Sequence, residues 1–298
     1  MSSAVHPSSE NYQPKGDTGD GMVCSGGSQD ALAITKRAKS NLAFALARMP
    51  KERRRDMITF YAYCRVIDDI ADCEVTAIEV KKERLQHWRD ILHGEREAAD
   101  GSLEAETLGI CRKYDIPVEH MVGIIDGVSM DLSPRRFGTP EDLEKYCYHV
   151  ASLVGLVSIE MFGYKNAQCR DFAVQLGYAL QWTNIIRDVA TDSRNGGRIY
   201  LPEIDLHRFH LTDADILGGT QDGRFLNLME YEYQRAVGYY DKAMELLPAE
   251  DEPTMHPGLV MARIYRELLE KIRADGFRVF DKDYRLSRWR KLWLLLTT

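Results

Sequence analysis

The sequence predicts an all-α fold, a single-domain helical bundle, and three observations support this prediction. Apolar residues recur at helical spacing almost without interruption from Asp30 onward. No stretch shows the sustained alternation of a β-strand, and no internal repeat of fixed period is visible. No linker divides the chain after this point, and 298 residues, 44% of them hydrophobic, are enough for one sizeable core.

Caps and breakers predict where the helices begin and end. Asp30 is a candidate N-cap for a helix through Leu46, because its side-chain oxygen can accept a first-turn N–H. Pro50 lies at the start of the next helix, where its missing N–H costs nothing. From there, helical spacing covers segments separated by breaks that contain Gly or Pro: residues 50–72, 76–93, 103–114, 117–131, 141–162, 168–192, 222–247 and 257–275.

The N-terminal segment differs in composition from the rest of the chain. It is rich in Ser and Gly and cannot bury enough apolar surface to offset the entropy of an ordered chain. It also lacks the basic region followed by an apolar run that marks a secretory signal. We therefore predict a disordered segment over residues 1–30, a folded domain over residues 31–298, and a cytoplasmic location.

Composition excludes several classes of protein. A net charge of -7, from 39 basic and 46 acidic residues, argues against a protein that coats nucleic acid. The chain has too little Pro and Gly for collagen-like or low-complexity material. The cysteines lack the C-x-x-C spacing of a zinc or redox site, and we expect reduced, mostly buried thiols at these positions: Cys24, Cys64, Cys73, Cys111, Cys147 and Cys169.

The first of two acidic segments covers residues 61–72. At 100° per residue, Asp68 and Asp72 share one face of a helix, and Tyr61 and Arg65 lie on the turns before them. The segment therefore presents a pair of carboxylates on one side of a helix that is otherwise apolar.

The second acidic segment covers residues 181–192 and repeats this arrangement. Gln181, Asn184, Asp188 and Asp192 fall within an arc of roughly 80° by the same helical geometry. Two helices thus each carry carboxylates at i and i+4 on one face.

Two explanations fit such pairs. The simpler one is a solvated acidic face, since like charges at this spacing cost an isolated helix only ~0.2–0.5 kcal/mol per pair. However, Asp68 and Asp188 lie among apolar neighbours, and buried carboxylates need cations to remain ionised. Mg²⁺ takes carboxylate oxygens and keeps positions open for substrate phosphates. The pattern therefore favours a diphosphate held by magnesium above an apolar cavity.

The two acidic segments resemble the aspartate-rich motifs of the squalene/phytoene synthase family, the head-to-head prenyl transferases. The resemblance covers nearly all of residues 36–298. It implies an all-α bundle of the class I isoprenoid synthase type with a central apolar cavity. Besides YAYCRVIDDIAD and QWTNIIRDVATD, the matching segments are KSNLAF (39–44), YCYHVASLVG (146–155), GRIYLP (197–202) and RVFDKDYRLSRWRKL (278–292).

The resemblance implies a reaction between two identical allylic diphosphates. Mg²⁺, for which Mn²⁺ could substitute, would be held on one diphosphate by Asp68 and Asp72. On the other side it would be held by Asn184, Asp188 and Asp192. Ionisation of the allylic C–O bond, attack by the second substrate's double bond and loss of a proton then close a cyclopropane ring.

The resemblance also assigns substrate contacts and catalytic groups. Tyr146 and Tyr61 would lie beside the carbocation, where a phenol face stabilises positive charge and its hydroxyl handles a proton. Arg65 and Arg187 would bind phosphate oxygens, although salt bridges with nearby aspartates explain them equally well. The further candidate substrate contacts are Lys39, Ser40, Gln181, Asn184, Tyr265 and Arg278.

The resemblance does not decide the product. The chain looks most like bacterial enzymes that join two farnesyl diphosphates into presqualene diphosphate, and NADPH would be needed only if the reaction continued to squalene. Phytoene synthesis from two geranylgeranyl diphosphates is the near alternative. A non-catalytic lipid-binding or assembly homologue, and a head-to-tail synthase with a second DDxxD, are further alternatives. This chain keeps its motif aspartates and reads NIIRDVATD instead of DDxxD.

Expected partners follow from the same resemblance. They are the isoprenyl diphosphate substrates and downstream isoprenoid-pathway enzymes, with no nucleic acid, and we expect a monomer. The C-terminal residues 289–296 combine basic and aromatic–apolar side chains. They could rest on the inner face of the membrane or pack on the bundle.

Overall fold

The structure is a computed structural model that describes residues 45–73, 75–133 and 135–297. The predicted disordered segment 1–30, Cys24, the helix predicted to begin at Asp30, and the candidate substrate contacts Lys39 and Ser40 lie outside these ranges. The division at residue 30 therefore stays a prediction.

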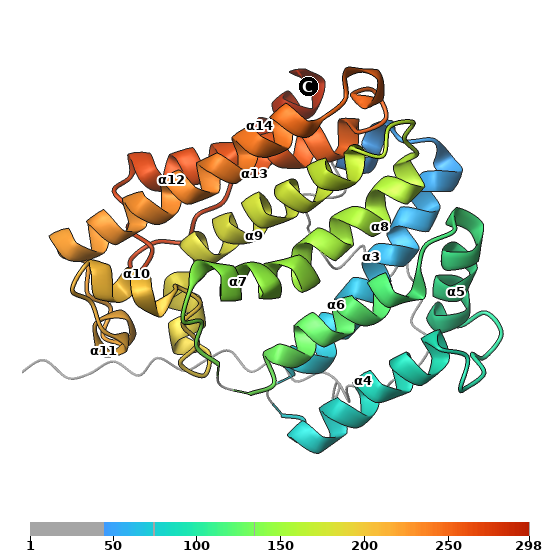
Figure 1. Cartoon of the computed structure of the whole chain (residues 1–298), viewed down its shortest axis with the longest axis horizontal. Helices are drawn as coiled ribbons and strands as arrows, with labels where there is room; N and C mark the ends of the chain where they lie inside the picture. The colour runs from blue at the N-terminus through green and yellow to red at the C-terminus, as the bar shows by residue number, and fades with distance from the viewer. Residues whose placement is uncertain (1–44, 74, 134, 298) are drawn as a thin grey trace, which may run out of the picture.

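Helices form all the regular secondary structure in the described ranges, as the sequence predicts. The long helices run alongside one another as a bundle, with α4 and α5 at one side and α10 and α11 at one end (Figure 1). The helices are α3 (Lys51–Asp72), α4 (Ile78–Leu92), α5 (Leu103–Tyr114), α6 (Val118–Met130), α7 (Pro140–Cys147), α8 (Leu153–Phe162), α9 (Cys169–Arg194), α10 (Glu203–Arg208), α11 (Asp213–Leu217), α12 (Gly223–Leu246), α13 (His256–Ala274) and α14 (Arg288–Thr297), with short helical turns η1 (Leu46–Arg48), η2 (Tyr148–Ser152) and η3 (Ala249–Asp251).

Most predicted helix boundaries are confirmed to within about two residues, and the predicted helix over 141–162 is corrected. It consists of α7 and α8 joined by a π-helical turn, η2. Neighbouring helices approach this turn very closely. A Cβ on Gly127 of α6 would lie 2.7 Å from the His149 Cβ, and one on Gly177 of α9 would lie 2.5 Å from the Ser152 Cα. Glycine is therefore required at both contacts.

The sequence did not predict α10, α11 and α14. The first two have 6 and 5 residues, too short for a helical apolar pattern to stand out. A capping box at Thr212 and Asp215 starts α11, with each side chain bonded to the other residue's backbone N–H.

Helix α9 lies in the middle of the bundle, in contact with α8, α12 and α13. Trp182 on this helix is fully buried, and its indole N–H donates to Glu232 of α12 at 2.8 Å. The buried polar pair is completed by Arg235, which contacts both Glu232 and Asp205 of α10. The second acidic motif therefore sits on a helix that is fixed from several sides.

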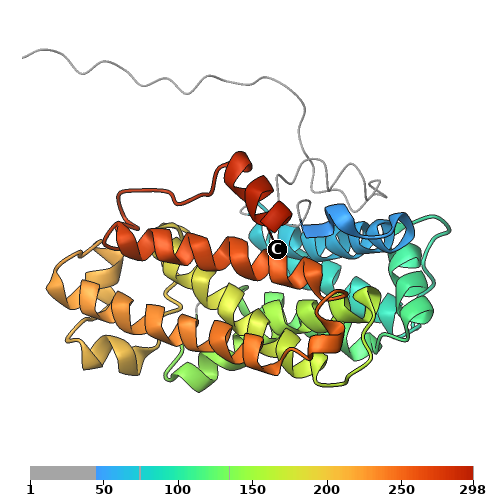
Figure 2. The same cartoon turned by 90° about the horizontal axis from the view of Figure 1, so that it is seen from above.

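The C-terminal helix α14 packs on the bundle, across α13 (Figure 2). Leu294 and Leu295 are buried against Val260 and Ile264 of α13, whereas Trp293 stays partly exposed. The segment therefore packs on the bundle through these residues, and its contact with a membrane stays an expectation. Among the described residues, no helix combines the length and the apolar composition that crossing a bilayer requires.

The cysteines within the described ranges are free thiols, as predicted. Three are buried, Cys111, Cys147 and Cys169, and burial is the main cause that raises the pKa of each. A protonated buried thiol is inert, so we assign these side chains to packing.

Candidate active site

The two acidic motifs meet near one end of the bundle. The carboxyl ends of α3, α6 and α9 lie there beside the connecting residues 131–133, 135–139 and 195–202 (Figure 1). Besides the two acidic helices, these connecting residues supply side chains to the site.

On α3 the aspartates differ in their surroundings. Asp68 is half-buried, and this burial raises its pKa to about 7 although the Arg65 guanidinium opposes the shift. Asp72, one turn later, is 61% exposed. Asp69 points outward and pairs with Arg65 at 2.6 Å. The sequence predicted a largely buried acidic helix, and the exposure of Asp72, the last residue of α3, corrects this.

On α9 the polar residues bond to one another. The Arg187 guanidinium grips the Asp188 carboxylate with two hydrogen bonds, one of them 2.7 Å from Nε to Oδ1. Burial disfavours the charge of Arg187, and hydrogen bonds with Asp188 and Tyr265 overcome this, so its pKa is raised. The structure thus brings Tyr265 of α13 to the second motif.

One turn away, Asn184 donates from Nδ2 to the Gln181 side chain at 3.3 Å. Its Oδ1 is buried and has no hydrogen-bond partner among the residues that the structure describes. At the end of the helix, burial and the charge of Asp188 raise the pKa of Asp192 to about 7, and Arg198 opposes the shift. The face predicted from helical spacing is therefore polar and only partly satisfied by the protein itself.

The centre of the site is Asp131, which the sequence did not single out. It follows α6, and its two carboxylate oxygens accept hydrogen bonds from Tyr146 at 2.8 Å and from Tyr200 at 2.9 Å. The rings of these tyrosines stack, with centroids 5.3 Å apart. Burial and the charge of Asp131 hold the pKa of Tyr146 well above its ordinary value. A single carboxylate thus orients two phenols.

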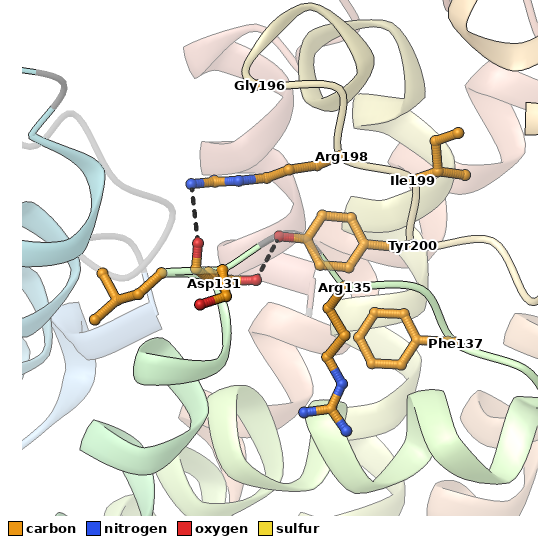
Figure 3. A pocket seen from close by; sticks show the side chains of 9 residues that line it. Asp131, Arg135, Phe137, Gly196, Arg198, Ile199 and Tyr200 are labelled. Atoms are coloured by element: carbon orange, nitrogen blue, oxygen red, sulfur yellow. Dashed lines mark hydrogen bonds between the residues drawn. The ribbon is translucent and has the colours of Figure 1, made fainter. Parts of the chain in front are cut away.

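Arg198 connects the two acidic helices. Its guanidinium lies 3.6 Å from the Asp72 carboxylate of α3 and 3.5 Å from the main-chain carbonyl of Asp131 (Figure 3). Its charge also opposes the rise in the pKa of Asp192 on α9. One cation therefore faces carboxylates from three elements at the end of the bundle.

A pocket of about 180 Å³ opens at this cluster. Asp131, Arg198 and Tyr200 lie on one side of it, and Arg135 stands over the ring of Phe137 at 5.5 Å on the other (Figure 3). The pocket thus offers two guanidinium groups beside aromatic rings. This lining is more polar than that of the central apolar cavity implied by the resemblance. The central apolar cavity stays an expectation.

Two remaining candidates lie differently. Tyr61 is half-buried on α3, two turns before Asp68. Arg278 is exposed after α13 and contacts Asp281 at 3.4 Å, beside the group formed by Asp275 and Lys282. Among the described residues, no hydrogen bond or ion pair joins Arg278 to the acidic helices.

The donor set fits divalent metal ions that are shared with a phosphate ligand. The described residues contain no group of three or more His, Cys, Asp or Glu side chains already assembled to hold a metal. Magnesium typically takes one or two carboxylates and completes its shell with water and phosphate oxygens, so it needs no such cage. The unpartnered Oδ1 of Asn184 and the raised pKa values of Asp68 and Asp192 mark groups that a cation would satisfy.

Comparison with known proteins identifies the family. The family model described as squalene/phytoene synthase matches residues 35–290. The chain belongs to the squalene/phytoene synthase family. Members of this family are prenyltransferases that act on isoprenyl diphosphates with divalent metal ions, and the chain is an enzyme of this class.

Individual relatives agree with this assignment. A phytoene synthase of Arthrospira platensis is 33% identical over 265 residues, which cover 83% of this chain and 84% of that protein. A crystal structure of a dehydrosqualene synthase superposes with a TM-score of 0.79 at 26% identity, covering 90% of this chain and 93% of that one. The squalene synthase HpnC of Alicyclobacillus acidocaldarius shares the fold, with a TM-score of 0.71 at 24% identity over 83% and 93% of the two chains.

Sequence reasoning missed some residues of the site for identifiable reasons. Arg198 and Tyr200 lie in the GRIYLP segment, which was recognised as a family match without roles for its side chains. Asp131 is the last residue of the helix predicted over residues 117–131, and Arg135 lies in the irregular segment after it. A charged residue at or after the end of a helix is common on protein surfaces, so neither position stood out.

Proposed function

We propose that this enzyme catalyses the head-to-head condensation of two identical allylic isoprenyl diphosphates. The observation that carries the proposal is the meeting of two acidic helix ends around the Asp131, Tyr146 and Tyr200 cluster, in a chain of this family. Two sets of carboxylates suit a reaction with two diphosphates.

In this proposal Asp68 and Asp72 bind magnesium on one diphosphate, and Asn184, Asp188 and Asp192 do so on the other. The metal, when bound, neutralises the charge that develops on the leaving diphosphate as the allylic C–O bond breaks. Asp68, Asp188 and Asp192 are half-buried, so less water surrounds their carboxylates, and their attraction for the cation is stronger.

The arginines neutralise the remaining phosphate charge. Arg187 is oriented by Asp188 and Tyr265, so one edge of its fork is fixed before substrate arrives. Arg65 is exposed and held by Asp69, and it reaches a phosphate only by leaving that partner or by sharing it. Arg198 is the best placed of the three to contact both diphosphates, since it faces both acidic helices.

Tyr146 and Tyr61 act on the hydrocarbon part of the substrates. The second substrate's double bond attacks the allylic cation, forming a carbon–carbon bond, and a proton then leaves so that a cyclopropane ring closes. Asp131 accepts the hydrogen of the Tyr146 hydroxyl, so the phenol oxygen can take the departing proton as its own hydrogen passes to the Asp131 carboxylate. The released diphosphate is the alternative acceptor of that proton.

Two chain lengths each have support. Farnesyl diphosphate, with presqualene diphosphate as the product, is favoured by the similarity to the dehydrosqualene synthase structure. Geranylgeranyl diphosphate, with phytoene as the product, is favoured by the curated relatives, which include phytoene synthases at 30–34% identity. The residues that hold the diphosphates have the same roles in both cases.

A product assay tests the proposal. The purified protein with Mg²⁺ is given farnesyl diphosphate or geranylgeranyl diphosphate, each with and without NADPH, and the lipid extract is analysed by mass. A thirty-carbon product supports the farnesyl reaction, and its dependence on NADPH separates presqualene diphosphate from squalene. A forty-carbon product supports phytoene synthesis. Folded protein that converts neither substrate would refute the proposed function.

A further inference from the structure

The segment that contains Arg198 and Tyr200 is irregular, yet both of these side chains make defined contacts with Asp131. Alternate residues of the segment face opposite ways: Arg198 and Tyr200 contact Asp131, whereas Ile199 and Leu201 are buried in the core. The segment forms neither a helix nor a strand. Its carbonyl groups therefore need partners from elsewhere.

One arginine supplies these partners. The Nη1 of Arg136 donates to the main-chain carbonyl of Ile199 and, at 3.1 Å, to that of Leu201, the residues on each side of Tyr200. The other edge of the same guanidinium binds Asp213 of α11 through two hydrogen bonds of 3.0 and 2.9 Å. All three guanidinium nitrogens are engaged, in the planar fork that only arginine provides.

Backbone bonds place Arg136 firmly against the segment. The N–H groups of Glu203 and Ile204 donate to the carbonyls of Phe137 and Gly138, at 2.8 and 3.1 Å. The segments 135–138 and 198–204 therefore lie side by side, and the Arg136 side chain crosses between them. Arg136 itself is not in the pocket, whose lining includes its neighbours Arg135 and Phe137.

We propose that Arg136 and Asp213 form a clamp that positions Tyr200 and Arg198 for the reaction. The clamp fixes the backbone on each side of Tyr200, so that the Tyr200 hydroxyl meets Asp131 and the Arg198 guanidinium reaches Asp72. Through Asp131, the same clamp helps to hold Tyr146. This inference rests on the proposed function, and it makes Arg136 and Asp213 positioning residues that do not touch the substrate.

The clamp is distinguished from ordinary surface ion pairs by its backbone contacts. Loss of the Arg136 guanidinium leaves two carbonyls without a charged donor and lets the Tyr200 segment shift, and a displacement of about 1 Å can cost ~10²-fold in rate. A matched control is the Arg89–Asp126 pair of α4 and α6. Its side chains are 20% and 48% exposed and 2.8 Å apart, against 23%, 47% and 2.9 Å for Arg136–Asp213.

A double-mutant cycle tests the clamp. The variants are Arg136→Gln, Tyr200→Phe and their combination, with Arg89→Gln alone and combined with Tyr200→Phe as controls. We expect Arg136→Gln to lower kcat by ~10–100-fold with little change in KM, Arg136→Lys to recover little, and Arg89→Gln to leave kcat within about twofold. Because Arg136 acts partly through Tyr200, its loss should cost less in the Tyr200→Phe background than in the unchanged protein, so the combined loss should fall below the product of the two single losses. Losses that multiply would overturn the proposal, as would full activity of Arg136→Gln or Tyr200→Phe.

Amide hydrogen exchange gives a readout that does not depend on activity. Exchange at Glu203 and Ile204 should become faster in Arg136→Gln, and also in Asp213→Asn, which keeps the guanidinium but weakens its anchor. It should stay unchanged in Arg89→Gln. Unchanged exchange in both clamp variants would refute the clamp. Faster exchange in a protein that converts no isoprenyl diphosphate would refute the proposed function and leave the clamp standing as a structural device.

Discussion

The two acidic helices bring similar carboxylates to the site from different surroundings. Helix α9 is packed among α8, α12 and α13, and its Asp188 is already gripped by Arg187. Helix α3 ends at the surface, where Asp72 is 61% exposed and Asp69 pairs with Arg65 on the outside. We infer that the α9 side of the site is organised in advance, while the α3 side adjusts when a diphosphate arrives.

The largest effect should come from removing one carboxylate on each helix. Asp68→Ala and Asp188→Ala should each lower turnover by at least ~10³-fold, because lost metal binding removes several kcal/mol of charge stabilisation. Turnover is measured with the substrate identified in the product assay, and circular dichroism should show unchanged helical content. Retained activity in both variants would eliminate the metal assignment.

The same two variants should also differ in thermal stability, because Asp68 of α3 and Asp188 of α9 have different surroundings. Asp68→Ala should raise the melting temperature at pH 8. Burial raises the pKa of Asp68 to about 7, so at pH 8 its ionised carboxylate destabilises the folded protein, and the substitution removes this cost. Asp188→Ala should lower it, because the half-buried Arg187 loses its partner. Equal shifts in one direction, measured by thermal denaturation, would contradict the difference between the helices.

The next effect concerns the two phenols on Asp131. Tyr146→Phe and Tyr200→Phe each leave one carboxylate oxygen without its phenol, and we expect kcat to fall by ~10–100-fold in each. Tyr146→Phe should also change the ratio of products, since this side chain handles the departing proton. A product ratio identical to that of the unchanged protein would remove Tyr146 from the proton step.

A moderate effect is expected from pH. Burial raises the pKa of Asp68 and of Asp192 to about 7, so the folded protein holds more protons than the unfolded chain between pH ~4 and 7. Stability without metal should therefore fall as pH rises through this range. Magnesium with pyrophosphate should stabilise the protein more at pH 8 than at pH 6, because binding requires ionised carboxylates. A stabilisation independent of pH, seen in melting curves, would contradict the buried-carboxylate explanation.

The smallest effect should come from Asp69→Asn. Its pair with Arg65 is exposed, and such i, i+4 pairs contribute ~0.3–0.5 kcal/mol. We expect the free energy of unfolding to change by no more than this, and kcat to stay within about twofold. Denaturant titration and the product assay would measure both. A large loss of activity would mean that Asp69, and not only Asp68 and Asp72, binds the metal.

Most of the helices, and the side chains that share a face of each helix, could be predicted from the sequence alone. The 3.6-residue period places Asp68 with Asp72, and Asn184 with Asp188 and Asp192, from the order of the residues alone. Gly and Pro breaks predicted most helix boundaries, and the joint motifs predicted the family. These features are local, because residues four apart on a helix are neighbours in every fold.

The contacts between elements and the burial of each group depend on tertiary packing, and local sequence patterns do not predict them. Asp131 follows a different helix from Tyr146 and lies 69 positions from Tyr200, yet one carboxylate accepts both phenols. The exposure of Asp72 and the reach of Arg136 to the carbonyl of Leu201 likewise depend on how the helices and their connections pack. Helical periodicity orders the faces of a single helix and contains no distance between two of them, so these contacts could not be predicted from spacing.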